Sequence, residues 1–216
     1  AGGLNHFSIL LRATYKDSGI DGYPLINKNF EGYYSDLVND HEGFFSNAGA
    51  ERGLFFELFK RYGYLPITTD SHLGEYLSWA YSVADHDGIL DFYDKYKKRC
   101  LSFFSNDGYE QFFDMSHPQP HERAIPIIES IVADLNMLEH AVNIKNENFI
   151  ECLPNDIVVE VPAIINKTGV HGKKLDNYPE PFGALLNAQV GTIQLTTKAI
   201  LNESKQTAIH ALLADP

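Results

Sequence analysis

An asparagine and a histidine stand side by side near the start of the sequence, in the segment AGGLNHF. An imidazole nitrogen can bind a divalent transition metal, and an amide can hold a hydroxyl or a carbonyl through one donor and one acceptor. Asn5 and His6 could therefore form part of a site for a metal and a polyol. The alternative is a helix start, with Asn5 as the N-cap and His6 in the first turn. One histidine cannot hold a metal alone, so other ligands would have to come from elsewhere.

Asp70 and His72 form a second candidate pair, in the segment TTDSHLGEY. Two residues apart within a helix they would face different ways, but at a helix start both side chains can enter one cleft. The carboxylate could then act as a general base, and the imidazole as an acid or a base. In the alternative, Asp70 caps the helix and His72 faces solvent.

Arg123 stands at the start of an apolar segment, in HPQPHERAIP. The helix dipole disfavours a cation at this position, so we expect an anionic partner, which could be a structural carboxylate or a bound substrate. We therefore name Arg123 as a candidate substrate-binding residue. The prolines around His117 and His121 favour a loop over the helical spacing that two metal-binding histidines need.

Composition excludes several classes of function. The 216 residues have a formal net charge of -12, and the only concentrated basic segment is KYKKRC, so nucleic acid is not an expected partner. No apolar run reaches the roughly 20 residues of a membrane-spanning helix. The two cysteines cannot frame a disulfide scaffold, which fits a reducing compartment, and we expect the cytoplasm. The chain also lacks the glycine-rich phosphate motifs of nucleotide-binding proteins, so we expect no NAD site within it.

Hydrophobic spacing predicts helices, then a small sheet, then helices. Helices are expected over 50–64 with a stop at Gly63, from Asp70 to about 81, over 121–140, and from about 181 to 214. Short β-branched runs at 141–146, 148–153 and 156–165 predict strands of an antiparallel sheet, and 17–30 and 105–120 are expected to be loops. The predicted fold class is α+β, in one domain that spans residues 1–216.

Several segments, taken in order, resemble the glycoside hydrolases of family 4, which are NAD- and metal-dependent α-glucosidases, α-galactosidases and α-galacturonidases. These segments are AGGLNHF, KRYGYLPITTDSHLGEYLSWAY, HERAIPIIESI, VVEVPAIINKTGVHG and the C-terminal PFGALLNAQVGTIQLTTKAILNESKQTAIHALLADP. The resemblance implies a fold like the C-terminal domain of lactate and malate dehydrogenases. It also implies that the chain is the substrate-binding and oligomerisation domain of a longer enzyme, which follows an NAD-binding Rossmann domain.

The resemblance further implies roles for the candidate residues. Asn5 would bind sugar hydroxyls and His6 would be a ligand of the catalytic Mn²⁺. Members that act on phosphorylated sugars have a tyrosine base in the segment where this chain has Asp70 and His72. Asp70 therefore becomes the candidate catalytic base, with His72 beside it, and either of the two would handle the C2 proton. The family's metal-binding cysteine lies upstream of the Asn-His pair, where neither cysteine of this chain stands.

The implied reaction hydrolyses an O-glycosidic bond by redox-assisted elimination, an exception among glycosidases. NAD⁺ takes hydride from C3 of the sugar, a base removes the acidified C2 proton, the aglycone leaves, water adds and the hydride returns. The expected partners are a sugar glycoside and further copies of the same chain. Two alternatives remain open: a non-catalytic oligomerisation module, and the substrate half of a lactate/malate-type dehydrogenase.

Overall fold

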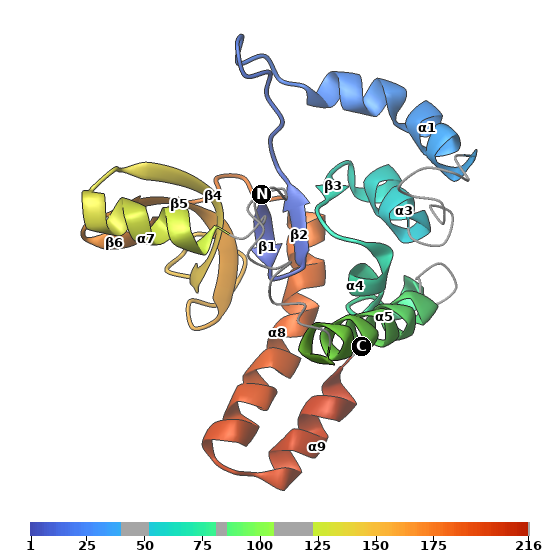
Figure 1. The fold of residues 1–216 in the computed structure, drawn as a ribbon, viewed down its shortest axis with the longest axis vertical. Coiled ribbons are helices and arrows are strands. Elements are labelled where there is room, and N and C mark those ends of the chain that lie inside the picture. Colours follow the sequence, from blue (N-terminus) through green and yellow to red (C-terminus); the bar gives the residue numbers. More distant parts are fainter. Residues whose placement is uncertain (40–51, 81–85, 106–122, 216) are drawn as a thin grey trace.

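The structure, a computed structural model, describes residues 1–39, 52–80, 86–105 and 123–215 (Figure 1). In chain order the elements are β1 (Gly2–Leu4), β2 (Phe7–Leu10), α1 (Tyr23–Asn39), α3 (Gly53–Tyr62), β3 (Leu65–Pro66), α4 (Asp70–Gly74), the 3-10 turn η1 (Ser78–Ala80), α5 (His86–Ser105), α7 (Ala124–Ala133), β4 (Met137–Lys145), β5 (Val158–Asn166), β6 (Gly169–Gly172), α8 (Glu180–Leu201) and α9 (Lys205–Ala214).

The strands form one sheet in the order β3-β2-β1-β5-β4, and β6 pairs with β5. Every pairing between these strands is antiparallel. The predicted α+β class with an antiparallel sheet is therefore confirmed, but the sheet also includes the N-terminal hairpin β1–β2, which the sequence analysis missed. The strand expected at 148–153 is wrong, because this segment is a turn whose Ile150 and Leu153 enter the core.

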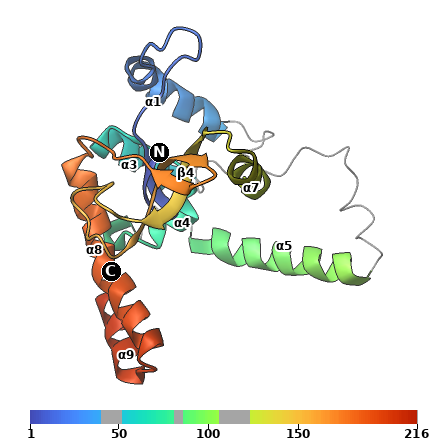
Figure 2. The same cartoon turned by 90° about the vertical axis from the view of Figure 1, so that its left-hand side faces the viewer.

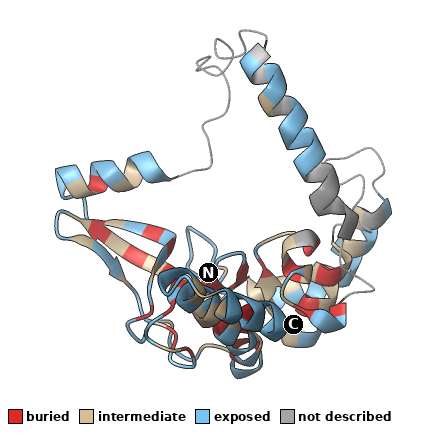
Figure 3. Cartoon of the chain, turned by 90° about the horizontal axis from the view of Figure 1, so that it is seen from below, coloured by how far each residue is buried: buried red, intermediate tan, exposed pale blue. Residues whose placement is uncertain are grey.

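The main core lies between the centre of the sheet and helices α3, α4 and α8. Phe7 of β2 contacts Phe182 of α8, with ring centroids 5.1 Å apart. Figure 3 shows the buried positions gathered around the sheet, while most of α1 and α9 is exposed. The largest side chains that are fully enclosed here are apolar: Phe7, Ile9, Leu54, Leu58, Leu73, Ile150, Val159, Val161, Phe182 and Leu186. Burial of these side chains stabilises the arrangement of the hairpin, α4 and α8 around one another.

Helix α7 packs on the β4–β5 end of the sheet. Its Ile127 and Ile131 contact a small cluster that includes Val142 and Ile165. The helix ends at Asp134, whose φ of 55° is left-handed, and β4 begins three residues later. The helix predicted over 121–140 is thus too long, because a left-handed residue stops the helical hydrogen bonds.

The other helix predictions have mixed outcomes. Helix α3 and its stop are confirmed, since the N–H of Gly63 bonds to Phe59 O. Two helices over 180–214 are also confirmed. The long helix expected from Asp70 is instead the short α4 followed by η1. The loop expected over 17–30 ends at residue 22, because α1 begins at Tyr23. The loop expected over 105–120 lies almost wholly outside the described residues.

Two parts extend away from the sheet. Figure 2 shows α5 projecting to one side, and the antiparallel pair α8–α9 projecting from the body of the chain. None of the helices in the described ranges is long and apolar enough to cross a membrane.

Candidate functional site

The Asn5–His6 pair forms the loop of the β1–β2 hairpin. Leu4 pairs with Phe7, so only these two residues connect the strands. Asn5 has a φ of 44°, in the left-handed region that asparagine tolerates better than most residues, and its carbonyl accepts a hydrogen bond from Ser8 Oγ at 2.8 Å. Both loop side chains are exposed. The alternative of a helix start is therefore wrong, and the pair stands at the tip of a hairpin.

His72 of α4 lies against the tip of this hairpin. Its ring stacks on the ring of His6, with centroids 4.3 Å apart and an angle of 18° between the planes. Its Nδ1 is 3.9 Å from Glu75 Oε2, and 42% of its side chain is exposed. The fold thus brings together two imidazoles that are distant in the sequence and that the sequence analysis did not pair.

Asp70 is bonded through its carboxylate to the start of α3. Its side chain is fully buried, and its two carboxylate oxygens accept the backbone N–H groups of Leu54 at 2.7 Å and Phe55 at 2.8 Å. These N–H groups belong to the first turn of α3, where a carboxylate also interacts favourably with the helix dipole. Of the two alternatives that the sequence left open, the one in which both side chains enter a single cleft is therefore wrong. Asp70 does cap a helix, but it caps α3 and not its own.

Two further residues reach the hairpin tip, and the sequence analysis missed both. Tyr76 follows α4; burial and the charge of Glu75 raise the pKa of its hydroxyl, and the nearby Asn5 side chain opposes that shift. Glu160 of β5 lies close enough to Ser8 and His6 for both to affect its pKa, and its Oε1 is buried without a hydrogen-bond partner among the described residues. Burial raises the pKa of the Glu160 carboxyl, against the opposing effects of Ser8, the N-terminal amine and His6. Only strand pairing reveals this neighbourhood, because Glu160 lies opposite Gly3 of β1.

The anionic partner expected for Arg123 is Glu139. Arg123 Nε lies 2.9 Å from Glu139 Oε2, and only 7% of the Glu139 side chain is exposed. The N–H of His140 donates to the second carboxylate oxygen at 3.2 Å. This pair belongs to α7 and β4, at the opposite end of the sheet from α4 (Figure 1). The structure does not bring Arg123 to the hairpin tip, and its contact with substrate stays a prediction.

The residues at the tip can supply part of a metal site. Within the part of the chain that the structure describes, no three side chains of histidine, cysteine, aspartate or glutamate are grouped as metal ligands. An exposed His6 with a second imidazole beside it can offer one nitrogen ligand. A divalent metal at His6 therefore fits only if the remaining ligands come from a substrate or from outside this chain.

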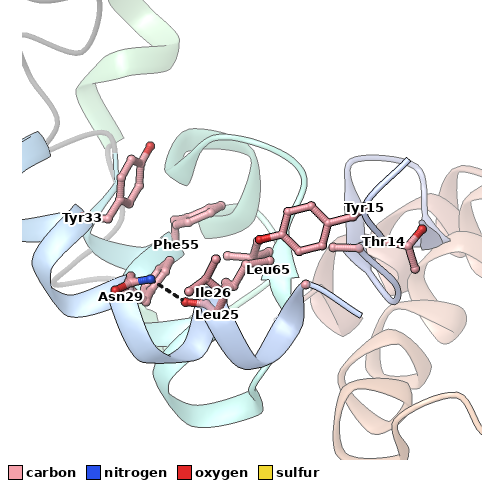
Figure 4. A pocket seen from close by; sticks show the side chains of 11 residues that line it. Thr14, Tyr15, Leu25, Ile26, Asn29, Tyr33, Phe55 and Leu65 are labelled. Atoms are coloured by element: carbon pink, nitrogen blue, oxygen red, sulfur yellow. Dashed lines mark hydrogen bonds between the residues drawn. The ribbon is translucent and has the colours of Figure 1, made fainter. Parts of the chain in front are cut away.

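A separate apolar groove lies between α1 and α3 (Figure 4). It encloses about 550 Å³. Its lining residues are mostly apolar or aromatic: Ala13, Thr14, Tyr15, Gly22, Leu25, Ile26, Asn29, Phe30, Tyr33, Phe55 and Leu65. Among the described residues that line this groove there is no acidic, basic or imidazole side chain, whereas the hairpin tip has two imidazoles, so the tip remains the better candidate site.

A comparison with known proteins places the chain in a family. The model of the "Family 4 glycosyl hydrolase C-terminal domain" matches residues 1–216. The chain belongs to this family of glycosidases. Membership confirms the resemblance seen in the sequence and decides against a lactate/malate-type dehydrogenase.

Curated relatives agree with this assignment. An α-glucosidase of Erwinia rhapontici is 40% identical over 240 residues, a match that covers 100% of this chain and 51% of the relative. An α-galacturonidase of Thermoanaerobacter italicus is 25% identical over 227 residues, covering 99% of this chain and 49% of the relative. The chain thus spans about half the length of these family 4 relatives.

Solved structures share the fold. The putative glucosidase LplD of Bacillus subtilis matches with a TM-score of 0.72 and 22% identity, covering 100% of this chain and 50% of that one. A 6-phospho-α-glucosidase from gut microorganisms, in complex with NAD and Mn²⁺, matches with a TM-score of 0.73 and 22% identity, covering 99% of this chain and 50% of that one. The predicted C-terminal-domain fold is therefore confirmed.

Proposed function

We propose that this chain is the C-terminal substrate domain of a glycosidase that depends on NAD and a divalent metal and cleaves O-glycosidic bonds by redox-assisted elimination. When bound, the dinucleotide would accept and return a hydride, and the metal would stabilise negative charge on the sugar oxygens. The observation behind this proposal is the 40% identity to an α-glucosidase across the whole chain. We place the NAD site outside this chain.

Two residues at the hairpin tip would bind the metal and the sugar. His6 would hold the metal through one ring nitrogen, and Asn5 would bind sugar hydroxyls with its amide. Both side chains are exposed in the two-residue loop, so a substrate can reach them without rearrangement of the core.

Of the two candidates for the C2 proton, His72 is the better placed. Its side chain is part exposed and stacks on His6, whereas Asp70 is buried with its carboxylate directed at the start of α3. An imidazole side chain can act as a general acid or as a general base. We therefore assign the proton transfer to His72 and helix capping to Asp70.

The test uses the full-length protein encoded with this chain. Aryl α-glucosides, α-galactosides and α-galacturonides are offered after NAD and metal have been removed by gel filtration with a chelator. Cleavage should return only when NAD⁺ and Mn²⁺ are both added. A full rate without either addition, or no cleavage of any of the three substrates, would contradict the proposal.

A second role rests on a separate observation. Helices α8 and α9 expose a group of large apolar side chains, each more than two thirds exposed: Ile200, Leu201, Leu212 and Leu213. Ile200 and Leu201 lie next to the turn between the two helices, whereas Leu212 and Leu213 lie at the other end of α9, which is beside Thr192 of α8, so the helix pair has exposed apolar side chains at both ends. We propose that a second copy of this chain covers them, so that the domain also assembles the enzyme.

A further inference from the structure

Gln189 is a polar residue on the buried face of α8. The buried positions of this helix are Phe182, Gly183, Leu186, Gln189 and Val190. Only 4% of Gln189 is exposed, and burial of an amide costs free energy unless it is hydrogen-bonded. Its Nε2 donates to the backbone carbonyl of Tyr76 at 3.0 Å. An apolar side chain would fill the same position without this cost, so the bond to Tyr76 is what the glutamine adds.

Tyr76 lies two residues beyond the end of α4, and its backbone is bonded on both sides. Its N–H donates to Leu73 O at 3.2 Å, and its C=O accepts the bond from Gln189. Its ring stacks on Phe7 of β2, with centroids 4.9 Å apart and 4° between the planes. Tyr76 therefore joins the end of α4 to both β2 and α8.

This buried stack lies next to the stack at the hairpin tip. His6 and Phe7 are consecutive in the sequence, and their rings stack on His72 and Tyr76, which are four residues apart. Phe7 is fully buried, whereas His6 is exposed. A shift of Tyr76 relative to Phe7 would therefore also move His72 relative to His6.

Helix α4 depends on its neighbours for its position. It has only five residues, Asp70–Gly74, too few for a helix to be stable through its own hydrogen bonds. Its start is bonded to α3 through the Asp70 carboxylate, and the segment that follows its end is bonded to α8 through Gln189. His72 lies between these two attachments.

Resting on the proposed function, we propose that Gln189 is a positioning residue that keeps the His72 ring against His6 through the backbone of Tyr76. It lies in the core and does not touch the substrate. Its loss should let residues 72–76 shift and move the proton-transferring imidazole relative to the sugar. Misplacement of a catalytic group by about 1 Å can lower the rate by roughly 100-fold, so even a smaller shift should lower kcat.

Gln189→Met in the full-length protein tests this role, because methionine has nearly the same length but no N–H donor. We expect kcat for the preferred aryl glycoside to fall by roughly 5- to 50-fold, with KM changed far less. In the His72→Phe background the same substitution should have no further effect on kcat, because the group that it positions is gone. The control is Gln194→Met on the same helix, whose amide donates to the Asp156 carboxylate at 3.2 Å and which should leave kcat unchanged.

Two kinetic results would overturn the proposal. One is an unchanged kcat in Gln189→Met, and the other is the same fall in kcat with and without His72, which would show a general loss of structure. If Gln189→Met does not fold, Gln189→Asn is measured in the same way, because its shorter side chain draws the donor back from Tyr76.

Crystal structures separate this proposal from the proposed function. If the wild type cleaves no glycoside, or if His72→Phe keeps the wild-type kcat, the proposed chemistry fails and the positioning role is judged from structures of the full-length wild type and Gln189→Met. The ring centroids of His6 and His72 should lie near 4.3 Å apart in the wild type, and farther apart or in more than one arrangement in the variant. The same arrangement in both proteins would overturn the role of Gln189 on its own.

Discussion

The rings of His6 and His72 lie face to face, with centroids 4.3 Å apart, although one belongs to a hairpin loop and the other to a short helix. The hairpin and α4 share the main core, through Phe7 and Leu73, so this stack depends on the packing of the fold. It places an exposed candidate base directly beside the candidate metal ligand.

His72→Phe tests whether His72 transfers a proton or only stacks on His6. A phenyl ring can keep the contact with His6 but cannot move a proton, so kcat of the full-length enzyme should fall by about 100-fold or more, with KM changed little. The measurement is steady-state cleavage of an aryl glycoside, with His210→Phe on the exposed surface of α9 as the matched control. A wild-type kcat in His72→Phe would remove His72 from the mechanism.

Asp70→Ala should act first on stability. The change removes a buried carboxylate that accepts two N–H groups at the start of α3, and caps of this kind contribute about 0.5–2 kcal/mol. The midpoint of thermal unfolding of the full-length protein should fall, while Asp156→Ala, which removes an exposed carboxylate, should leave it nearly unchanged. A second variant, Asp70→Asn, checks the role in catalysis. If it has wild-type stability but no longer exchanges the C2 proton of the sugar with solvent, Asp70 is the base and this account is wrong.

The sequence predicted the elements whose signals are local. Helix α3 has four apolar residues on one face and a glycine stop, and both features are found in the structure. Arg123 at a helix start implied a carboxylate, and Glu139 provides it. A charge at the end of a helix and the helical spacing of apolar residues both involve residues that are close in the sequence, so the sequence alone can predict their consequences.

The parts that were missed depend on contacts between distant segments. Strand β1 has three residues, two of them glycines, which is too short for any periodic pattern. A Cβ at Gly3 would lie 2.7 Å from Ser8 Oγ, so the glycine serves close packing and not flexibility. Likewise, Asp70 caps a helix that precedes it in the sequence, and Glu160 and Ser8 lie near each other because both pair with Gly3 of β1. Spacing along the chain contains none of this information.

Glu160→Gln should change the dependence of stability on pH. Burial is the main cause that raises the pKa of this carboxyl in the folded state. Since a raised pKa means that the folded state binds the proton more tightly, the stabilising contribution is present below the ordinary glutamate pKa and is lost as pH rises through the folded value. The variant should therefore melt at a higher temperature than the wild type at about pH 8, with a smaller difference near pH 5.

Thermal melts of the full-length protein across that range test this expectation. Glu129→Gln, which replaces an exposed glutamate on α7, is the control and should follow the wild type at every pH. A difference between Glu160→Gln and the wild type that stays constant with pH would show that burial of Glu160 is not the cause.

Leu212→Glu combined with Leu213→Glu should dissociate the assembly. The two side chains are 77% and 78% exposed, and charges placed between two copies would have to be desolvated. Sedimentation of the full-length variant should give a smaller mass than the wild type, whereas Thr196→Glu on the exposed side of α8 should not. A monomeric wild type at high protein concentration, or a variant with the wild-type mass, would contradict the proposed interface.

The most direct test of the central claim is the affinity of the full-length protein for Mn²⁺, measured by calorimetry or by electron paramagnetic resonance without substrate turnover. If the tip of the β1–β2 hairpin holds the metal, His6→Ala should weaken binding by at least about 10-fold, the scale of losing one ligand from a site of few ligands. His210→Ala should bind Mn²⁺ as the wild type does. Unchanged affinity in His6→Ala would place the metal elsewhere and contradict the account.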